Sequence, residues 1–464
     1  MRGSTLKAAH KRPQLVDGPV VKTLVRMALP MMVGIVGMVA FNLVDTFFVG
    51  RLGTLELAAM SFTFPVVLVV MSISRGLGVG ATSVLARAIG EGDHHKVKRM
   101  TTDALLLSVL VVAAFVVVGL LTIEPLFRLL GADEEVLPLI KKYMSVWYIG
   151  MPFVVVPMVG NSAIRATGDT KTPSAIMVVA ILVNTTLDPM FIFGIGPFPR
   201  LELAGAALAT VIARATTLVI ALLVLTRREK MLTLERVAIR EILATWRQVL
   251  YLGVPAAATY IIIPLSTGIV TRLIAGYGAV HVAGFGVATR IEMFALTVVM
   301  ALAVVLIPFV GQNVGAGRHR RIHRAVSYSQ LFSLGWGVVL FAVFSLLGRP
   351  IASIFNKNPD VIGTAALYVG IVSLSYAAYG IIELNASTFN GLKKPLPAAA
   401  LSLIRMFALY VPLAFLGSQL LGLKGIFGGI AIANFGTAAV STLWVRRQMA
   451  KSELRRPAPV PPSR

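Results

Sequence analysis

Two acidic residues inside otherwise apolar segments are the part of this sequence best suited to chemistry. Asp45 lies in FNLVDTFFVG and Asp188 in NTTLDPMFIFG. An ionisable side chain inside a membrane segment costs about 3 kcal/mol by insertion scales, so its presence there points to a function. Removal from water and mutual repulsion both favour neutralising one of two neighbouring carboxylates. The pair therefore predicts a site for a coupling cation, H⁺ or Na⁺.

Residues on the same helices extend this candidate site. Asn42 precedes Asp45 by three residues and Asn184 precedes Asp188 by four, so each asparagine is expected on the face of its acid. Pro189 removes a backbone donor and frees a carbonyl oxygen, a common way to build an ion site in a helix. The alternative is that each acid caps a broken helix or lines a wet vestibule without a role in transport.

Further candidates lie on neighbouring apolar segments. Tyr143 and Thr210 are expected at the depth of the two acids, because their segments run in the opposite direction, and they complete the predicted cation-coupling group. Met38, Phe41 and Met177 are candidate substrate contacts, since methionine surfaces re-pack around varied apolar ligands. The simpler interpretation of these three residues is ordinary packing.

A second group of charges occurs in the last third of the chain. Glu383 and Arg405 flank the lysines at 393–394 at similar distances, so a hairpin would place them at one depth. This favours a structural ion pair over a coupling site. Arg290 and Glu292 are two residues apart and point to different faces of a helix, which excludes a simple helical pair.

The segments that must hold these residues are membrane spans. Of the 464 residues 57% are hydrophobic and 14% are charged, against about 25% charged in soluble proteins. A spanning helix needs about 20 apolar residues, and long unbroken apolar runs favour helices over the alternating segments of barrels. Twelve such stretches occur, at about 24–50, 57–86, 102–125, 137–164, 174–198, 203–226, 248–276, 282–312, 326–348, 361–388, 396–420 and 423–446. The predicted fold is an all-α integral membrane protein.

The charge distribution predicts the orientation in the membrane. The net charge of +23 gathers in short loops and at both ends of the chain. By the positive-inside rule both termini lie in the cytoplasm, and the cations face anionic lipid rather than nucleic acid. We therefore expect a multi-pass protein of the inner or plasma membrane. The chain has no cysteine, and its polar start shows no signal peptide.

An internal repeat relates the two halves of the chain. Pro30 pairs with Pro255 and Gly90 with Gly315, and the two residues of each pair are 225 positions apart in the sequence. This constant spacing is called the repeat offset. Two six-helix repeats of the same orientation predict two lobes related by a pseudo-twofold axis along the membrane normal, with a substrate path between them. The segment 227–247 is expected to lie on the cytoplasmic membrane surface or to be a solvated connector. The predicted parts are a basic tail at 1–21, an N-lobe at 22–226, the linker at 227–247, a C-lobe at 248–448 and a disordered basic tail at 449–464.

Several motifs resemble those of one transporter family. FNLVDTFFVGRLG, GLGVGATSVLARAIGEGD, IRATGDTKTP and NTTLDPMFIFGIG, with TFNGLKKPLP in the second half, are similar to the multidrug and toxic compound extrusion (MATE) family, in its DinF-like prokaryotic branch. The resemblance covers residues 20–448. It implies a twelve-helix, V-shaped carrier that exports cationic or amphipathic compounds in exchange for H⁺ or Na⁺. The N-lobe network of that branch corresponds here to Asp45, Tyr143, Asn161, Asn184, Asp188 and Thr210.

The resemblance also bears on the second half of the chain. Asn161 and Asn184 are carried over as substrate contacts as well, and Na⁺ would bind at Asp45 and Asp188. Other branches of the family place acids in spans 7 and 10. Span 7 here has none and Glu383 is displaced from the usual position in span 10, which argues against a cation site in the C-lobe.

Other functions remain open at this point. A lipid-linked oligosaccharide flippase of the wider superfamily would recruit cations for phosphates, and Arg75, Arg214, Arg290 and Arg405 are available. A membrane-embedded enzyme or a channel would need a catalytic constellation or a polar stripe, and neither is evident. No nucleotide-binding loop GxxxxGK[ST], HExxH or metal-ligand spacing occurs. We expect a monomeric transporter with no enzymatic activity and no cofactor besides the coupling ion.

Overall fold

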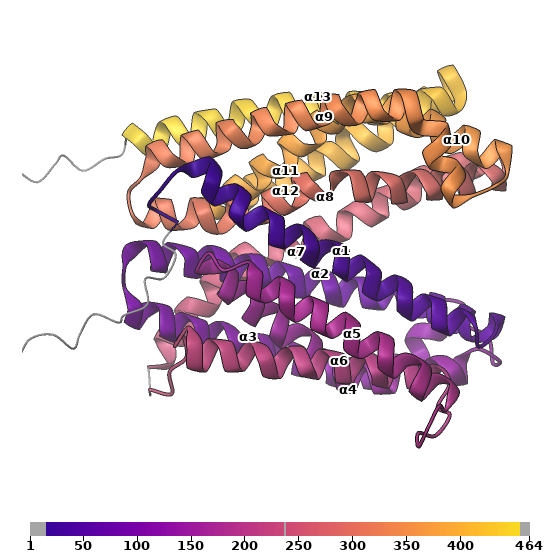
Figure 1. The fold of residues 1–464 in the computed structure, drawn as a ribbon, viewed down its shortest axis with the longest axis horizontal. Helices are drawn as coiled ribbons and strands as arrows, with labels where there is room; N and C mark the ends of the chain where they lie inside the picture. Colours follow the sequence, from indigo (N-terminus) through magenta and orange to yellow (C-terminus); the bar gives the residue numbers. More distant parts are fainter. Residues whose placement is uncertain (1–14, 236–237, 455–464) are drawn as a thin grey trace, which may run out of the picture. The chain divides into compact units, whose positions relative to one another are not determined.

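The computed structural model describes residues 15–235 and 238–454, and every regular element in those ranges is helical (Figure 1). The chain divides into two compact units. Unit 1 comprises Met1–Gly253 and Gly311–Ala316, and unit 2 comprises Val254–Val310 and Gly317–Arg464. The end of one long helix, residues 311–315, therefore belongs to unit 1 although the body of that helix lies in unit 2.

The helices follow each other with short connections. Unit 1 holds α1 (Val20–Gly50), α2 (Thr54–Glu91), α3 (His94–Leu129), α4 (Leu137–Ala166), α5 (Lys171–Phe193), α6 (Leu203–Leu223), the π-helical turn η1 (Val224–Arg228) and the start of α7 (Ile239–Ala275). Unit 2 holds the rest of α7, most of α8 (Ala279–Gly315), α9 (His319–Phe355), α10 (Pro359–Val372), the 3₁₀ turn η2 (Ser373–Ser375), α11 (Tyr376–Gly391), α12 (Pro395–Leu403), the π-helical η3 (Ile404–Tyr410) and α13 (Val411–Leu454).

The predicted all-α membrane fold is confirmed. Among the described residues, eleven helical stretches are long and apolar enough to cross a membrane. The last stretch, Pro395–Ala450, has 56 residues, too many for one span. It is broken at Gly422, whose φ of 59° is not helical, so it contains the last two of the twelve predicted spans.

The helices extend past the apolar stretches at their polar ends. α3 begins at His94, eight residues before the predicted apolar stretch, because Asp93 caps it by accepting a hydrogen bond from the Lys96 backbone N–H at 2.9 Å. α13 continues to Leu454. The structure therefore describes only part of each predicted basic tail, because residues 1–14 and 455–464 lie outside the described residues.

The segment that follows η1 is fastened to α3. Residues 229–235 are not helical, and α7 begins at Ile239. The Thr233 backbone N–H donates to the Thr102 hydroxyl at 3.1 Å, and that hydroxyl donates to the Thr233 carbonyl at 3.2 Å. Trp246 Nε1 donates to the Asp103 carbonyl at 2.9 Å. The first turns of α7 are thereby held as part of unit 1.

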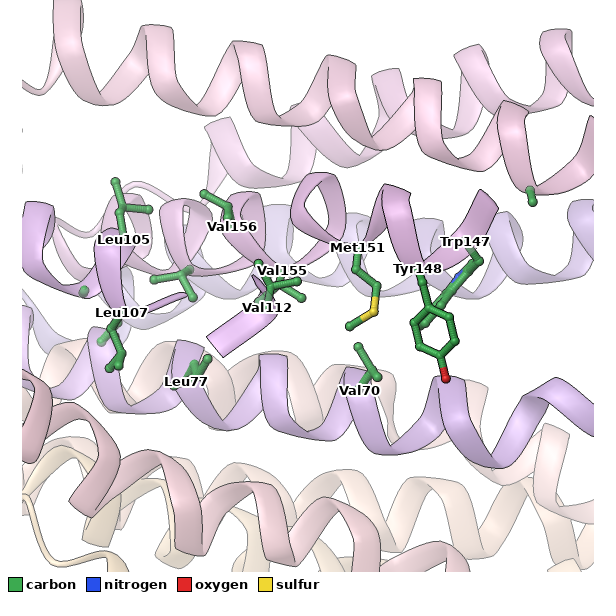
Figure 2. Packing of buried hydrophobic residues seen from close by; sticks show 14 of the residues in the cluster. Val70, Leu77, Leu105, Leu107, Val112, Trp147, Tyr148, Met151, Val155 and Val156 are labelled. Atoms are coloured by element: carbon green, nitrogen blue, oxygen red, sulfur yellow. The ribbon is translucent and has the colours of Figure 1, made fainter. Parts of the chain in front are cut away.

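α4 is the central helix of unit 1. It packs against α2, α3 and α6, and it is more completely buried than the other spans of this unit. Figure 2 shows its side chains, among them Met151 and Val155, meeting Val70 and Leu77 of α2 and Val112 of α3. α5 packs against α1 and α6. Residues on α1, α4, α5 and α6 can therefore approach each other inside this unit.

Two glycines of the repeat make a close helix crossing. A Cβ at Gly90 of α2 would lie 2.1 Å from the Gln312 carbonyl oxygen, and one at Gly315 of α8 would lie 2.3 Å from the Arg87 carbonyl oxygen. Only glycine permits such an approach between backbones. The contact is reciprocal because Arg87 and Gln312 are separated by the same repeat offset as the two glycines.

Candidate ion-binding site

The two predicted acids lie close together in unit 1. Asp45 on α1 is 8% exposed and Asp188 on α5 is fully buried. Their helices pack side by side, and the two carboxyl groups interact electrostatically. Two buried carboxylates at this range repel each other unless a cation neutralises one of them.

The acceptors around this pair outnumber the donors. Asn184 Nδ2 donates to Asp188 Oδ1 at 3.0 Å. Three further oxygens, Asp45 Oδ1, Asp188 Oδ2 and Asn184 Oδ1, are buried and accept no hydrogen bond from the described residues. Buried polar atoms are normally satisfied. Three acceptor atoms in one buried group form a site suited to a proton or a small cation.

Tyr143 of α4 completes the group on a third helix. Its side chain is 5% exposed, and it interacts electrostatically with both Asp45 and Asp188. Thr210 of α6 is half-buried, and no hydrogen bond joins it to either acid among the described contacts. The structure thus brings Asp45, Asp188, Asn184 and Tyr143 together, whereas no described hydrogen bond joins Thr210 to the acids.

Arg214 also belongs to this site, although the sequence alone did not predict it there. Its guanidinium lies over the ring of Phe41 at 4.4 Å and interacts electrostatically with Asp45. A signal is present in the sequence, because Arg214 follows Thr210 by four residues and so shares its helical face. With both acids ionised, two negative charges oppose one positive charge, which leaves one net negative charge.

Two predicted partners lie elsewhere. Asn42 is exposed on α1 whereas Asp45 is buried, so the prediction that they share a face is wrong. Asn161 shares α4 with Tyr143, but the 18 residues between them correspond to about 27 Å of helix at ~1.5 Å per residue. The buried Asn161 Oδ1, which accepts no described hydrogen bond, therefore belongs to another level of the unit.

The predicted substrate contacts Met38, Phe41 and Met177 lie against arginines. Phe41 is 3% exposed beneath Arg214, and Arg214 Nη1 lies 3.9 Å from Met177 Sδ. Arg75 Nη2 lies 3.8 Å from Met38 Sδ. These apolar side chains form a polarisable surface under two guanidinium groups, which is more specific than general core packing.

Glu383 and Arg405 lie together in unit 2. Arg405 Nη1 is 3.3 Å from Glu383 Oε1, and the guanidinium lies over the Tyr379 ring at 4.3 Å. Both Arg214 and Arg405 therefore combine a nearby carboxylate with an aromatic ring face, an arrangement that suits the planar guanidinium.

The donor set at Asp45 and Asp188 limits the ion. Among the residues that the structure describes, no group of three or more histidine, aspartate or glutamate side chains could hold a metal ion. Two carboxylates, an amide oxygen and a phenol remain. This set fits a proton, or one monovalent cation such as Na⁺, better than a divalent metal, which favours more carboxylate ligands.

The fold and the site together define a class of protein. The chain crosses the membrane many times and repeats a six-span plan. One repeat holds a buried ionisable group at the contact of several helices. Secondary transporters are built in this way, with coupling sites inside repeated helical units.

Comparison with known proteins identifies the family. The MatE family model matches residues 30–190 and again residues 255–416, and the two matches begin at Pro30 and Pro255, the pair that defines the repeat offset. The chain therefore belongs to the MATE family, as the sequence motifs predicted, and it is a transporter.

Individual relatives support the assignment. A protein named FAD transporter from Shewanella oneidensis is 40% identical over 91% of this chain and 94% of its own length. Multidrug export protein MepA of Staphylococcus aureus is 24% identical over 92% of this chain and 94% of its own length. The crystal structure of the Vibrio cholerae MATE transporter VcmN in the bent form is 31% identical, with a TM-score of 0.88 over 94% of this chain and 98% of that one.

Proposed function

We propose that this protein is an ion-coupled exporter in which Asp45 and Asp188 exchange a coupling cation, H⁺ or Na⁺, for a substrate. The observation that carries the proposal is the composition of the buried group. Two carboxylates face one guanidinium, and three buried oxygen atoms accept no described hydrogen bond. One monovalent cation neutralises the group, so ion binding and ion release switch its charge.

The structure suggests how this switch would act on α1. Asp45 and Arg214 interact electrostatically, so neutralising Asp45 weakens the attraction between α1 and α6. α1 is packed tightly on α5 at Gly34 and Gly37, where an added Cβ would lie 3.0 Å from Ser174 Oγ and 2.8 Å from Ile181 Cδ1. Pro30 interrupts the hydrogen bonding of α1 nearby. A change of charge at Asp45 would therefore move α1 relative to α5, and the close packing at Gly34 and Gly37 would transmit this movement between the two helices.

The first substrate class is cationic or amphipathic compounds. A site with one net negative charge attracts an organic cation, and this cation would compete with the coupling ion for the same carboxylates. Relatives named multidrug export proteins agree with that class. The relative named multidrug export protein supports outward transport.

A second substrate class is an anionic aromatic compound such as FAD. Arg75 and Arg214 rest on Met38 and Met177, and Arg214 also covers Phe41, so cationic groups and apolar faces alternate. This pattern suits a molecule that carries phosphates and flat rings. The relative named FAD transporter, 40% identical to this chain, supports the same class.

The flippase alternative receives less support. It requires cationic side chains available for lipid diphosphate. Arg214 interacts with Asp45 in unit 1, and Arg405 is paired with Glu383 in unit 2. Arg405 is thus engaged by a carboxylate of its own unit, and Arg214 would serve a phosphate group only after Asp45 is neutralised, here as for FAD.

Transport by reconstituted protein tests the proposal. Liposomes containing the protein would be loaded with ethidium or with FAD, and efflux would be followed under separate H⁺ and Na⁺ gradients. We expect wild-type efflux with one gradient and at least a tenfold loss in Asp45→Asn and Asp188→Asn. Glu134→Gln, which changes an exposed carboxylate, is the matched control. Wild-type efflux in either aspartate variant would refute the coupling role.

A further inference from the structure

Unit 2 contains a partly buried carboxylate, Glu292, that the proposed function does not use. Glu292 lies on α8, and Tyr368 Oη of α10 donates a hydrogen bond to its Oε2 at 2.5 Å. Tyr368 is 3% exposed. Glu292 also interacts electrostatically with Tyr376 of α11 and with Tyr410 of η3. Four elements thus converge on one carboxylate.

The charges around Glu292 do not balance. Arg405 interacts electrostatically with Glu292, but its Nη1 is directed to Glu383 at 3.3 Å. Two carboxylates against one guanidinium leave one net negative charge, as in unit 1. The Arg405 Nε and the Tyr376 hydroxyl are buried and make no hydrogen bond with the described residues. The cluster therefore contains polar groups without a described hydrogen-bond partner beside one negative charge that no cation balances.

The repeat places a tyrosine against a carboxylate in both units. Tyr368 follows Tyr143 by the repeat offset, and Val361 follows Val136 by the same spacing. All four residues are buried. Asp45 and Asp188 themselves have valines at the corresponding positions of the second half, Val270 and Val411. Each repeat therefore has a tyrosine at the equivalent position, whereas the acids beside the two tyrosines lie on helices that are not equivalent.

The backbone around this cluster is interrupted on two sides. α10 passes into α11 through the 3₁₀ turn Ser373–Ser375, directly before Tyr376. Arg405 and Tyr410 lie in the π-helical segment Ile404–Tyr410. π-Helical segments are rare and occur often at functional sites, because they misalign helical hydrogen bonds. A purely structural ion pair does not require either interruption.

We propose that Glu292 is a second proton-binding site of this transporter, held by Tyr368 and facing Arg405. The ligand is a proton because the surroundings are packed. The Tyr368 ring lies 5.4 Å from the Phe285 ring and 5.1 Å from the Phe427 ring, centroid to centroid. No group of three acidic or histidine side chains suited to a metal occurs among the described residues.

Proton exchange at Glu292 would redistribute Arg405. When Glu292 is ionised, it accepts the Tyr368 hydrogen bond and attracts Arg405. When a proton binds to a Glu292 oxygen, this attraction is lost and Arg405 is held by Glu383 alone. The titratable or charged side chains that face the site are Tyr368 of α10, Tyr376, Tyr379 and Glu383 of α11, and Arg405 and Tyr410 of η3.

Infrared difference spectroscopy of the full-length protein in lipid tests this inference. A protonated carboxyl group has a C=O stretching band that disappears on ionisation. Asp45→Asn/Asp188→Asn removes the two acids of the candidate ion-binding site, and in this background we expect one of the remaining pH-dependent C=O bands to belong to Glu292. Adding Glu292→Gln should abolish it, whereas adding Asp360→Asn, an exposed acid of unit 2, should not. Tyr368→Phe should move the band to higher frequency, because the carboxyl group loses a hydrogen bond.

The outcomes separate this inference from the proposed function. The second site is overturned if Glu292→Gln leaves every pH-dependent C=O band unchanged. Wild-type efflux by Asp45→Asn overturns the coupling role of unit 1 and leaves the band of Glu292 unaffected. Glutamine retains an oxygen that accepts from Tyr368, so a preserved thermal unfolding transition confirms that the variant is folded.

Discussion

Arg214 and Asp45 interact inside unit 1, from helices α6 and α1, while the ring of Phe41 supports the guanidinium at 4.4 Å. This interaction sets the charge of the site. Without Arg214 the group would hold two negative charges when ionised, and with it the group holds one. A single monovalent ion therefore neutralises the complete site, which is the condition for a coupled exchange of one charge.

Replacing Arg214 should change the response to the coupling ion. In Arg214→Gln the two carboxylates lose their only described cationic neighbour. The coupling ion should then bind more tightly and leave more slowly, so we expect a lower maximal efflux rate and a lower ion concentration at half-maximal rate. Arg214→Lys keeps the charge and should retain more activity. Equal ion dependence in the glutamine and wild-type proteins would show that Arg214 does not set the charge of the site.

The two asparagines offer a matched comparison. Asn184 is fully buried and donates to Asp188 at 3.0 Å, whereas Asn42 is exposed on α1. Asn184→Ala removes this donor and should reduce ion-driven efflux at least tenfold. Asn42→Ala should remain within twofold of wild type. The measurement is initial efflux from liposomes at equal protein content, and a larger loss in Asn42→Ala would contradict the assignment of the site to the buried face.

Part of this site can be predicted from the sequence, because a charged residue inside an apolar run is informative by itself. Asp45, Asp188 and the helices that carry them follow from that rule and from the length of the apolar segments. The spacing misplaces Asn42 because three residues leave about 60° between two side chains at 3.6 residues per turn. In α1 that angle separates a buried face from an exposed one.

Contacts between distant segments are beyond sequence reasoning. Arg214 is visible as an intramembrane charge, but its approach to Asp45 depends on how α6 packs near α1. Glu292 has Arg290 as its charged neighbour along its own helix, whereas its partner Tyr368 lies 76 residues away. The repeat offset contains a signal for this contact, because Tyr143 and Tyr368 are equivalent.

Replacing only one residue of the pair Glu383–Arg405 should lower the free energy of unfolding more than replacing both. The Arg405 side chain is 8% exposed and that of Glu383 is 27% exposed. Arg405→Met leaves two partly buried carboxylates without their cation, which should lower the free energy of unfolding by about 3 kcal/mol, the low end for a buried pair. Arg405→Met/Glu383→Leu should recover part of that loss, because Glu292 still lacks its cation. Thermal unfolding in detergent measures both, and a double variant no more stable than Arg405→Met would contradict the pairing.

The crossing of α2 and the end of α8 should tolerate no side chain at Gly90. A Cβ there would lie 2.1 Å from the Gln312 carbonyl oxygen, a backbone atom that cannot rotate away. Overpacking of this kind costs about 1–3 kcal/mol, so Gly90→Ala should lower the thermal unfolding temperature by several degrees. Gly268→Ala on α7 is the control, because no atom beyond its own stretch of helix backbone lies within 4 Å of its added Cβ. The same substitution at this helical glycine should raise the free energy of unfolding by about 0.5–1 kcal/mol. Equal unfolding temperatures for the two variants would show that the ends of α2 and α8 do not cross at Gly90.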